Sequence, residues 1–325
     1  MANEYQVAIL LPVQGTDAAL DRTVASVLAQ TETRWTLWLI ESDDARGRAA
    51  RWIGGDPRIQ CVRQIGRGCA AGLGQALARC PGDYTVFLDA EHCWEPGFLA
   101  LTTAFLQSNP LEDVVCMDAV ESSGPSVVAA RRSIFRERGA LRDALDLPAG
   151  TVPDAVLEGA CWYRGELAQH LRWGLYSRMA VTLMTADVAL RLAPALGRDS
   201  TALDYRLQAR LARTCPVNLL ALTGAVRWPT PWSAEQELQQ ERDGLEVFDE
   251  IHGRQWETDP EVARLRRERL SRLQRSPLQR LLGHMRELGC QTARAVLRAS
   301  GLPGVPHARA SAPMDLGGPQ VRHQR

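Results

Sequence analysis

The chain has 325 residues, enough to bury a sizeable core and to form one large domain with additions, or two domains. Its 38 basic and 38 acidic residues balance, so the whole chain has no electrostatic bias toward nucleic acid, and we expect no nucleic-acid partner. All the basic residues are arginine, which excludes mechanisms that need a lysine base or a lysine Schiff base.

The first third of the chain alternates apolar runs with segments of helical periodicity. The apolar runs predict strands at residues 7–13, 36–41, 59–63 and 114–117, and a further strand that begins at Tyr84. The periodic segments predict one helix that begins near Asp17 and three more that span residues 45–53, 69–79 and 97–107. This order implies βαβ units and an α/β fold, with a mostly parallel sheet covered by helices on both faces.

The stretch from Tyr84 to Trp94 provides the main prediction of a site. Its apolar run predicts a buried strand that delivers Asp89 and Glu91 to the carboxyl end of the sheet, where ligands of open α/β sheets bind. Two carboxylates there suit a hydrated Mg²⁺ or Mn²⁺ that holds a phosphate. The alternative is a solvated loop whose acids cap the next helix. His92 follows directly, and we interpret it as a hydrogen-bonding or surface residue rather than as a metal ligand.

The eight cysteines are scattered, without a C-x-x-C pair or a histidine cluster near them. We therefore expect a reducing compartment, no disulfide framework and no zinc site. The N-terminal residues show no secretory signal, and no apolar run approaches the ~18 residues that span a bilayer. These features predict a cytoplasmic location.

Three ordered segments resemble the family 2 glycosyltransferases of the GT-A fold. They are Val-Ala-Ile-Leu-Leu-Pro-Val at residues 7–13, Ser-Val-Leu-Ala-Gln-Thr at 26–31 and Gly-Asp-Tyr-Thr-Val-Phe-Leu-Asp-Ala-Glu at 82–91. The resemblance implies a GT-A-like sheet and the transfer of a sugar from a nucleoside-diphosphate sugar to an acceptor hydroxyl, with inversion and with Mn²⁺ or Mg²⁺. It also implies a glycan or lipid-linked glycan as the acceptor, in cell-envelope or surface polysaccharide biosynthesis.

The resemblance assigns roles to individual residues. Asp89 and Glu91 would hold the metal, and Asp204, in the first turn of a helical segment at residues 203–211, would be the catalytic base. The residues expected around the nucleotide and its diphosphate are Pro12, Gln14, Glu41, Asp43, Gly68 and Asp89. For Asp204, the alternative is a carboxylate that interacts with the helix dipole or pairs with Arg206 or Arg210.

Several positions depart from the family pattern. The departures are Gln14-Gly15 in place of Tyr-Asn, Glu41-Ser42 in place of Asp-Asp, Gly72-Leu73-Gly74 in place of Ala-Arg-Asn, Glu91 in place of Asp, and Leu203 in place of the Glu before the base. They predict altered donor recognition. They also leave open a catalytically inactive relative that binds a sugar nucleotide or a glycan.

The glycine-rich segment from Gly66 to Gly74 supports a competing interpretation. It resembles the pyrophosphate-binding turn of NAD(P)-dependent short-chain dehydrogenases. However, it follows the third predicted strand rather than the first, and those enzymes need a Tyr-x-x-x-Lys pair that a chain without lysine cannot form. We rank the dehydrogenase below the transferase and place these glycines near the diphosphate of the donor, or at a close contact between helix and sheet.

The predicted organisation has three parts. Residues 1–228 would form the GT-A-like domain, with a donor half to about residue 117 and an acceptor half at 118–228, where arginines at 131, 132 and 136 would meet a phosphate-bearing acceptor or line a solvated face. Residues 229–300 would form a helical extension, and residues 301–325 a disordered tail. Residues 262–300 carry ten arginines against two glutamates, and an apolar stripe at 278–288 suits either an anionic membrane surface, with the protein peripheral on the inner membrane, or packing against the domain.

Overall fold

The structure, a computed structural model, describes residues 5–66, 68–122, 132–133, 149–151, 161–165, 168, 170–173, 175, 177–229 and 233–275. All of these residues belong to Met1–Arg275, one of the two units into which the chain divides. The predicted acceptor contacts at Arg131 and Arg136, the side chain of Arg132, the apolar stripe at 278–288 and the predicted tail lie outside the described part.

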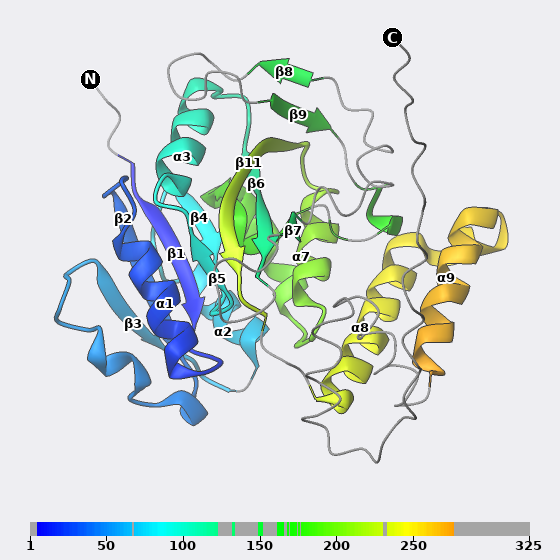
Figure 1. The fold of residues 1–325 in the computed structure, drawn as a ribbon, viewed down its shortest axis with the longest axis horizontal. Helices are drawn as coiled ribbons and strands as arrows, with labels where there is room; N and C mark the ends of the chain where they lie inside the picture. Colours follow the sequence, from blue (N-terminus) through cyan, green and yellow to red (C-terminus); the bar gives the residue numbers. More distant parts are fainter. Residues whose placement is uncertain are drawn as a thin grey trace, which may run out of the picture. The chain divides into compact units, whose positions relative to one another are not determined.

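A mixed sheet forms the centre of this unit (Figure 1). Its strands are β1 (Val7–Pro12), β2 (Trp35–Glu41), β3 (Ile59–Arg63), β4 (Tyr84–Phe87), β5 (His92–Trp94), β6 (Val114–Glu121), β7 (Arg132–Ser133), β8 (Ala149–Thr151), β9 (Cys161–Gly165), β10 (Thr182–Thr185) and β11 (Val217–Arg227). Their order is β3-β2-β1-β4-β10-β6-β11-β9-β8, with β5 paired to β11 and β7 paired to β6. Strands β1 to β4 are mutually parallel, β6 and β11 run in the same direction as these four, and β10 is antiparallel to both of its neighbours. The predicted α/β class with a mainly parallel sheet is confirmed.

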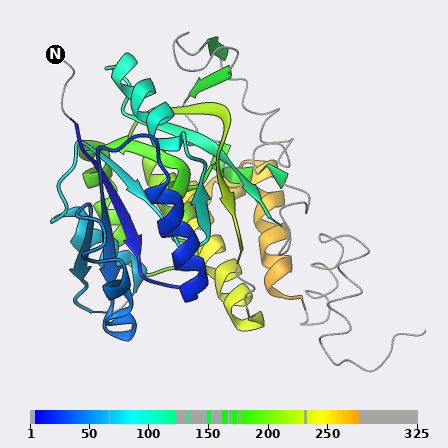
Figure 2. The ribbon, with the colours of Figure 1, turned by 60° about the vertical axis from the view of Figure 1, so that its left-hand side comes forward.

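Helices cover both faces of the sheet. The helices are α1 (Asp17–Leu28), α2 (Cys69–Leu77), α3 (Phe98–Ser108), α6 (Ala186–Arg191), α7 (Leu203–Leu211), α8 (Ala234–His252) and α9 (Pro260–Leu273). Short 3-10 segments are η1 (Asp43–Ala45), η2 (Arg48–Arg51), η3 (His170–Trp173), η4 (Met179–Val181), η5 (Ala193–Leu196) and η6 (Gly253–Glu257). In Figure 2, α1 (blue) lies on the near side of the sheet.

The alternation of side chains along β1 divides the interior into two cores. Ile9 and Leu11 point into the core shared with α1 and α3, whereas Leu10 points into the core shared with α2, α6, α7, α8 and α9. All three side chains are fully buried. Burial on both faces explains why β1 is a continuous apolar run rather than an alternating one, since a strand with helices on both sides meets no solvent.

One helix prediction in the donor half was wrong. Residues 45–53 form no α-helix; η1 and η2 occupy this region instead, separated by Gly47 with a φ of 84°. A left-handed glycine interrupts an α-helix, and here it allows the backbone N–H of Ala49 to donate to Oε1 of Glu41 at 2.6 Å. Strands β5, β7, β8, β9, β10 and β11 add to the strands that we predicted.

Helices α8 and α9 pack on the core beside α7. Ser233 caps α8 in a reciprocal pair with Gln236, as its position before a helical pattern predicts. Phe248 of α8 and Val262 of α9 are both fully buried in the core that also contains α7. Helices α8 and α9 lie side by side (Figure 1). Arg266 of α9 forms hydrogen bonds of 2.8 and 2.9 Å with Asp249 of α8, so this arginine is neutralised by the neighbouring helix. Across residues 5–275, where described, no helix combines the length and apolar character needed to cross a membrane.

Candidate functional site

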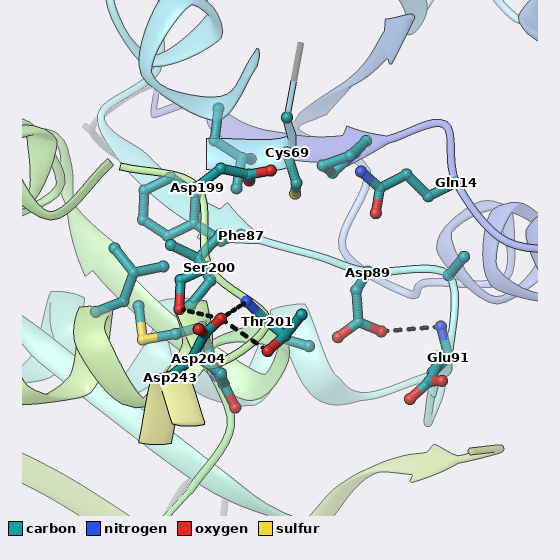
Figure 3. A pocket seen from close by; sticks show the side chains of 18 of the residues that line it. Gln14, Cys69, Phe87, Asp89, Glu91, Asp199, Ser200, Thr201, Asp204 and Asp243 are labelled. Carbon is teal, nitrogen blue, oxygen red and sulfur yellow. Dashed lines mark hydrogen bonds between the residues drawn. The ribbon is translucent and has the colours of Figure 1, made fainter. Parts of the chain in front are cut away.

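A cavity of about 780 Å³ opens beyond the carboxyl ends of β1 and β4. This is the edge at which ligands bind in open α/β sheets. Residues of β1, α1, α2, β4, η4, α7 and α8 and of the loops between them line it. The polar residues among them are Gln14, Asp89, Glu91, Arg198, Asp199, Ser200, Thr201, Asp204, Gln236, Gln239, Asp243 and Glu246. In Figure 3, Asp89 and Glu91 lie on one side of this cavity, and Asp204 and Asp243 lie on the other. The carboxylates predicted from the donor half and from the acceptor half therefore meet in one place.

Asp89 is held at the cavity by two hydrogen bonds to one of its oxygens. Oδ1 accepts the backbone N–H of Glu91 at 2.8 Å and the ring Nδ1 of His92 at 2.6 Å. The first bond is an Asx turn, a local arrangement that aspartate favours. Desolvation by the cavity walls raises the pKa of Asp89, but the neighbouring imidazole and the N–H of Glu91 oppose it and lower the pKa to about 2. Asp89 is therefore a carboxylate at any physiological pH.

A row of alternating charges connects Glu91 to Asp204. Arg227 donates to Oε2 of Glu91 from Nε at 3.0 Å and from Nη2 at 2.7 Å, and to Glu121 from Nη1 at 2.5 Å. Arg178 lies 3.8 Å from Glu121 and donates to Oδ2 of Asp204 at 3.3 Å. Burial lowers the pKa of Arg227, but the two carboxylates beside it outweigh burial and raise the pKa above its usual value. The guanidinium thus stays charged and neutralises Glu91.

Asp204 lies in the first turn of α7, as predicted, and its side chain faces the cavity. Besides the contact of Oδ2 with Arg178, Oδ1 accepts the backbone N–H of Met179 at 2.8 Å. These contacts fix the orientation of the carboxylate at the cavity wall. The predicted partners Arg206 and Arg210 bind elsewhere: Arg206 binds Glu250, and Arg210 donates to the carbonyl of Arg191.

Gly68 lies at the start of α2, where its φ of 90° requires a residue without a side chain. A Cβ at this position would lie only 2.5 Å from Cγ of Asp199, whose Oδ1 accepts the N–H of Ala70 at 3.4 Å. A carboxylate from the acceptor half thus caps α2, a helix whose own N-cap supplies no side-chain hydrogen bond. Next to this turn, burial raises the pKa of Cys69 to about 12, so that thiol is no nucleophile at neutral pH.

The loop between η5 and α7 is anchored by α8, which the sequence analysis did not connect with the site. Oδ2 of Asp243 accepts three hydrogen bonds (Figure 3). The donors are the backbone N–H of Thr201 at 2.7 Å, the hydroxyl of Thr201 at 2.8 Å and the hydroxyl of Ser200 at 3.1 Å. Gln239 donates to Oδ1 at 2.7 Å. A C-terminal helix therefore builds one wall of the cavity and holds the loop that precedes Asp204.

The predicted nucleotide contacts divide into two groups. Pro12, Gln14, Gly68 and Asp89 line the cavity, whereas Glu41 and Asp43 do not. Glu41 is buried and accepts the N–H of Ala49, and Asp43 is an exposed residue 3.7 Å from Arg46. At the Glu41-Ser42 departure from the family pattern, the glutamate carboxylate therefore stabilises the fold through Ala49 and does not face the cavity.

A divalent cation fits this cavity through Asp89. Oδ2 of Asp89 accepts no hydrogen bond within the described part of the chain, and the side chain is 55% exposed. Glu91, in contrast, is bound to Arg227. Over the same residues no three Asp, Glu, His or Cys side chains form a protein-only metal cage. This pattern matches Mg²⁺ or Mn²⁺ sites in which one or two carboxylates share the ion with substrate phosphates.

Comparisons with known proteins agree with this geometry. Residues 8–164 match the model of glycosyl transferase family 2. A curated Escherichia coli protein, UDP-Glc:alpha-D-GlcNAc-diphosphoundecaprenol beta-1,3-glucosyltransferase WfgD, is 25% identical over 111 residues, which are 33% of this chain and 43% of the relative. The crystal structure of S. aureus TarS superposes with a TM-score of 0.51 at 14% identity, covering 82% of this chain and 42% of TarS. TarS 1–349 in complex with UDP-GlcNAc gives the same TM-score and identity over 82% of this chain and 71% of that one.

The matched part thus spans less than half the length of the E. coli relative and of the longer TarS chain. The family match includes the cavity residues that we predicted in the donor half, which are Pro12, Gln14, Gly68, Asp89 and Glu91. The likeness to TarS extends the same fold over most of this chain. Residues 8–164 of this chain thus match glycosyl transferase family 2, and the chain has the GT-A fold.

Proposed function

We propose that this chain transfers a sugar from a nucleoside-diphosphate sugar to an acceptor hydroxyl. The observation that carries the proposal is the shared cavity of Asp89 and Asp204, one at the end of a donor-half strand and the other in an acceptor-half helix. A transferase needs both groups together, because the donor diphosphate and the attacking hydroxyl meet at a single anomeric carbon.

The chemistry proposed for these residues is a single displacement. The acceptor oxygen forms a bond to the anomeric carbon while Asp204 takes the hydroxyl proton, and the bond from that carbon to the diphosphate oxygen breaks. The nucleoside diphosphate leaves with the electron pair of that bond, so the configuration at the anomeric carbon inverts. Pro12, Gln14 and Gly68 would border the nucleotide. Glu41 and Asp43, which do not line the cavity, receive no role in this chemistry.

The charge of the cavity supports a requirement for a divalent cation. Six carboxylates line it: those of Asp89, Glu91, Asp199, Asp204, Asp243 and Glu246. Arg198 is the one cationic side chain among the described lining residues, and it pairs with Glu246. Such a wall repels an anionic diphosphate. Mn²⁺ or Mg²⁺ held by Asp89, with Glu91 as the second candidate ligand, would supply the neutralising charge.

For the acceptor we propose a lipid-linked glycan, in polysaccharide biosynthesis. The E. coli relative is named for an acceptor carried on diphosphoundecaprenol. An acceptor of this kind resides at a membrane surface, and the arginines at 280, 286, 294 and 298 would attract anionic lipid headgroups there. The protein would then act from the cytoplasm as a peripheral protein of the inner membrane.

A second candidate function is the binding of a sugar nucleotide or glycan without catalysis. The observation that favours it is the engagement of both oxygens of Asp204, by Met179 and by Arg178. Both carboxylate oxygens that could accept the proton of an acceptor hydroxyl are thus already engaged by the protein. The two candidates differ in whether the bound donor is broken down.

Hydrolysis of the donor separates them. We would measure release of nucleoside diphosphate from a panel of UDP- and GDP-sugars with Mn²⁺, together with calorimetric binding of UDP and GDP. The transferase is expected to hydrolyse one donor slowly. Asp204→Asn should lower that rate by about 10²–10⁴-fold and keep nucleotide binding, and Asp89→Asn should lose both. Asp249→Asn, an acid outside the cavity, serves as the control. Binding without hydrolysis in wild type would establish the second candidate.

A further inference from the structure

The side chain of His92 lies behind Asp89, outside the set of residues that line the cavity. Its ring is only 2% exposed, whereas the Asp89 side chain that it contacts is 55% exposed. The distance from Nδ1 to Oδ1 of Asp89 is 2.6 Å. A buried group thus makes its hydrogen bond to a residue that faces the proposed donor.

The backbone around His92 is fixed by the fold. The N–H of His92 donates to the carbonyl of Asp89 at 3.4 Å, which closes a turn over residues 89–92. Thr23 of α1 donates its hydroxyl to the carbonyl of His92 at 2.9 Å, and His92 pairs with Arg227 across β5 and β11. The imidazole is therefore a rigid donor that approaches Asp89 from the interior.

The chemistry of the two groups determines the direction of their hydrogen bond. The ionised carboxylate only accepts, so Nδ1 of His92 carries the proton. The other ring nitrogen, Nε2, is buried and has no hydrogen-bond partner within the part of the chain that the structure describes. An interior that leaves a polar atom unpaired in this way loses stability. The imidazole is thus poorly explained as a core residue and well explained by its bond to Asp89.

We propose that His92 is a positioning residue: it holds Oδ1 of Asp89 so that Oδ2 faces the donor diphosphate and its divalent cation. In Figure 3, the oxygen of Asp89 that is not bonded to Glu91 points toward the side of the cavity that contains Thr201 and Asp204. Groups that orient a metal-binding side chain in this way typically contribute 10- to 100-fold to metal affinity or activity. The inference rests on the proposed function, because it assigns Asp89 to the donor.

The test compares three replacements of His92 by calorimetric titration of UDP and of GDP, with and without Mn²⁺. Asn places an N–H close to the position of Nδ1, Gln places one close to that of Nε2, and Leu removes the donor. We expect Leu and Gln to weaken binding in Mn²⁺ by about 10- to 100-fold and Asn to retain it. Binding without the metal should be equal in all four proteins, which a merely structural role would not give.

Several results would contradict the proposed role of His92. If Leu and Gln bind as wild type does in Mn²⁺, or if Asn loses as much affinity as Leu, His92 does not position Asp89. Should thermal melts show that the Leu variant is unfolded, the comparison of Asn with Gln carries the test. If wild type binds neither nucleotide with Mn²⁺, the proposed function fails and the inference with it. Binding that is lost in Asp89→Asn but intact in His92→Leu refutes only the inference.

Discussion

Arg227 binds Glu91 through two guanidinium nitrogens that converge on the same carboxylate oxygen, at 3.0 Å and 2.7 Å. Both side chains are largely buried, with 17% and 21% of their surface exposed. The pair gives Glu91 a role that its place beside Asp89 in the sequence does not suggest. A carboxylate already neutralised by arginine attracts a cation less strongly than a free one.

We therefore predict that Glu91→Gln mainly lowers the stability of the fold, whereas Asp89→Asn mainly weakens nucleotide binding in Mn²⁺. Glu91→Gln leaves the buried charge of Arg227 with only Glu121, so it should lower the free energy of unfolding by about 1–3 kcal/mol. It should weaken the binding of UDP or GDP in Mn²⁺ less than Asp89→Asn does. Denaturant titration and calorimetry measure the two effects. A stable Glu91→Gln protein that has lost binding as completely as Asp89→Asn would instead make Glu91 a metal ligand.

The parts of the fold that the sequence predicts are those with local signals. Strands β1 and β4 are uniform apolar runs, and α1 begins at Asp17 after Thr16, whose hydroxyl oxygen accepts the N–H of Ala19. Strand β11 has no such signal, because its pairing with β6 shifts register around Thr223. Strand β5 is three residues long and begins with His92, and only its pairing with β11 makes it a strand.

The residues of the site also divide into those with a local sequence signal and those without one. Asp89 and Asp204 could be predicted, because each lies next to an element with a clear pattern. The contribution of Asp243 could not, because it depends on how α8 packs against a loop some forty residues earlier in the chain. One signal was available: Asp243 precedes Val247 on the buried face of α8, and an acid on a buried face needs partners. Glu41 lies on the same face of β2 as the buried Leu37 and Leu39, so the alternation of that strand was an available signal that its side chain turns inward.

A comparison of three glycines tests the turn before α2. Gly68→Ala should destabilise the protein by about 1–2 kcal/mol for its positive φ, and by about 1 kcal/mol more because the new methyl group displaces Asp199 from the N–H of Ala70. Gly66 has a similar positive φ, but a Cβ there would meet no atom within 4 Å. Gly66→Ala should therefore lower the stability only by the amount due to the positive φ. Gly74→Ala, within α2 and 3.6 Å from Leu196, should be neutral or stabilising.

Thermal or denaturant unfolding of the three variants gives these differences. A loss in Gly68→Ala no greater than that in Gly66→Ala would show that Asp199 does not stabilise α2. Because Gly68 and Asp199 both line the cavity, Gly68→Ala should in addition weaken nucleotide binding, whereas Gly74→Ala should not.

The proposed membrane contact predicts flotation with anionic vesicles. The full chain should float with phosphatidylglycerol vesicles at low salt and sink with phosphatidylcholine vesicles. Replacing Arg280, Arg286, Arg294 and Arg298 by Gln should abolish flotation, since each cation contributes about 1 kcal/mol near an anionic surface. Arg266→Gln is the matched control, because Arg266 already pairs with Asp249. Sinking of the wild-type protein with anionic vesicles, or flotation of the fourfold variant, would contradict the proposal.

Asp243 gives a stability prediction with a defined dependence on pH. Burial raises the pKa of this carboxyl, but the hydrogen bonds from Thr201, Gln239 and Ser200 outweigh burial, so its pKa lies below the usual 3.8. A pKa that is lower in the folded state means that the ionised group stabilises the fold above the unfolded pKa and loses this effect as the pH falls through the folded pKa. Asp243→Asn should thus cost about 1–3 kcal/mol at neutral pH.

The difference in unfolding free energy between wild type and Asp243→Asn should stay constant from about pH 8 to pH 5. It should shrink below about pH 4, where the unfolded chain binds the proton first, and be lost as the pH falls through the lower folded pKa. Asp249→Asn is the control on the same helix: its carboxylate is 35% exposed and pairs with Arg266, so its loss should cost less than about 1 kcal/mol. Equal losses in the two variants would show that α8 does not hold the loop at Thr201 through Asp243. A difference that does not shrink at all as the pH falls below the unfolded pKa would show that the hydrogen bonds, rather than the charge, stabilise this wall of the cavity.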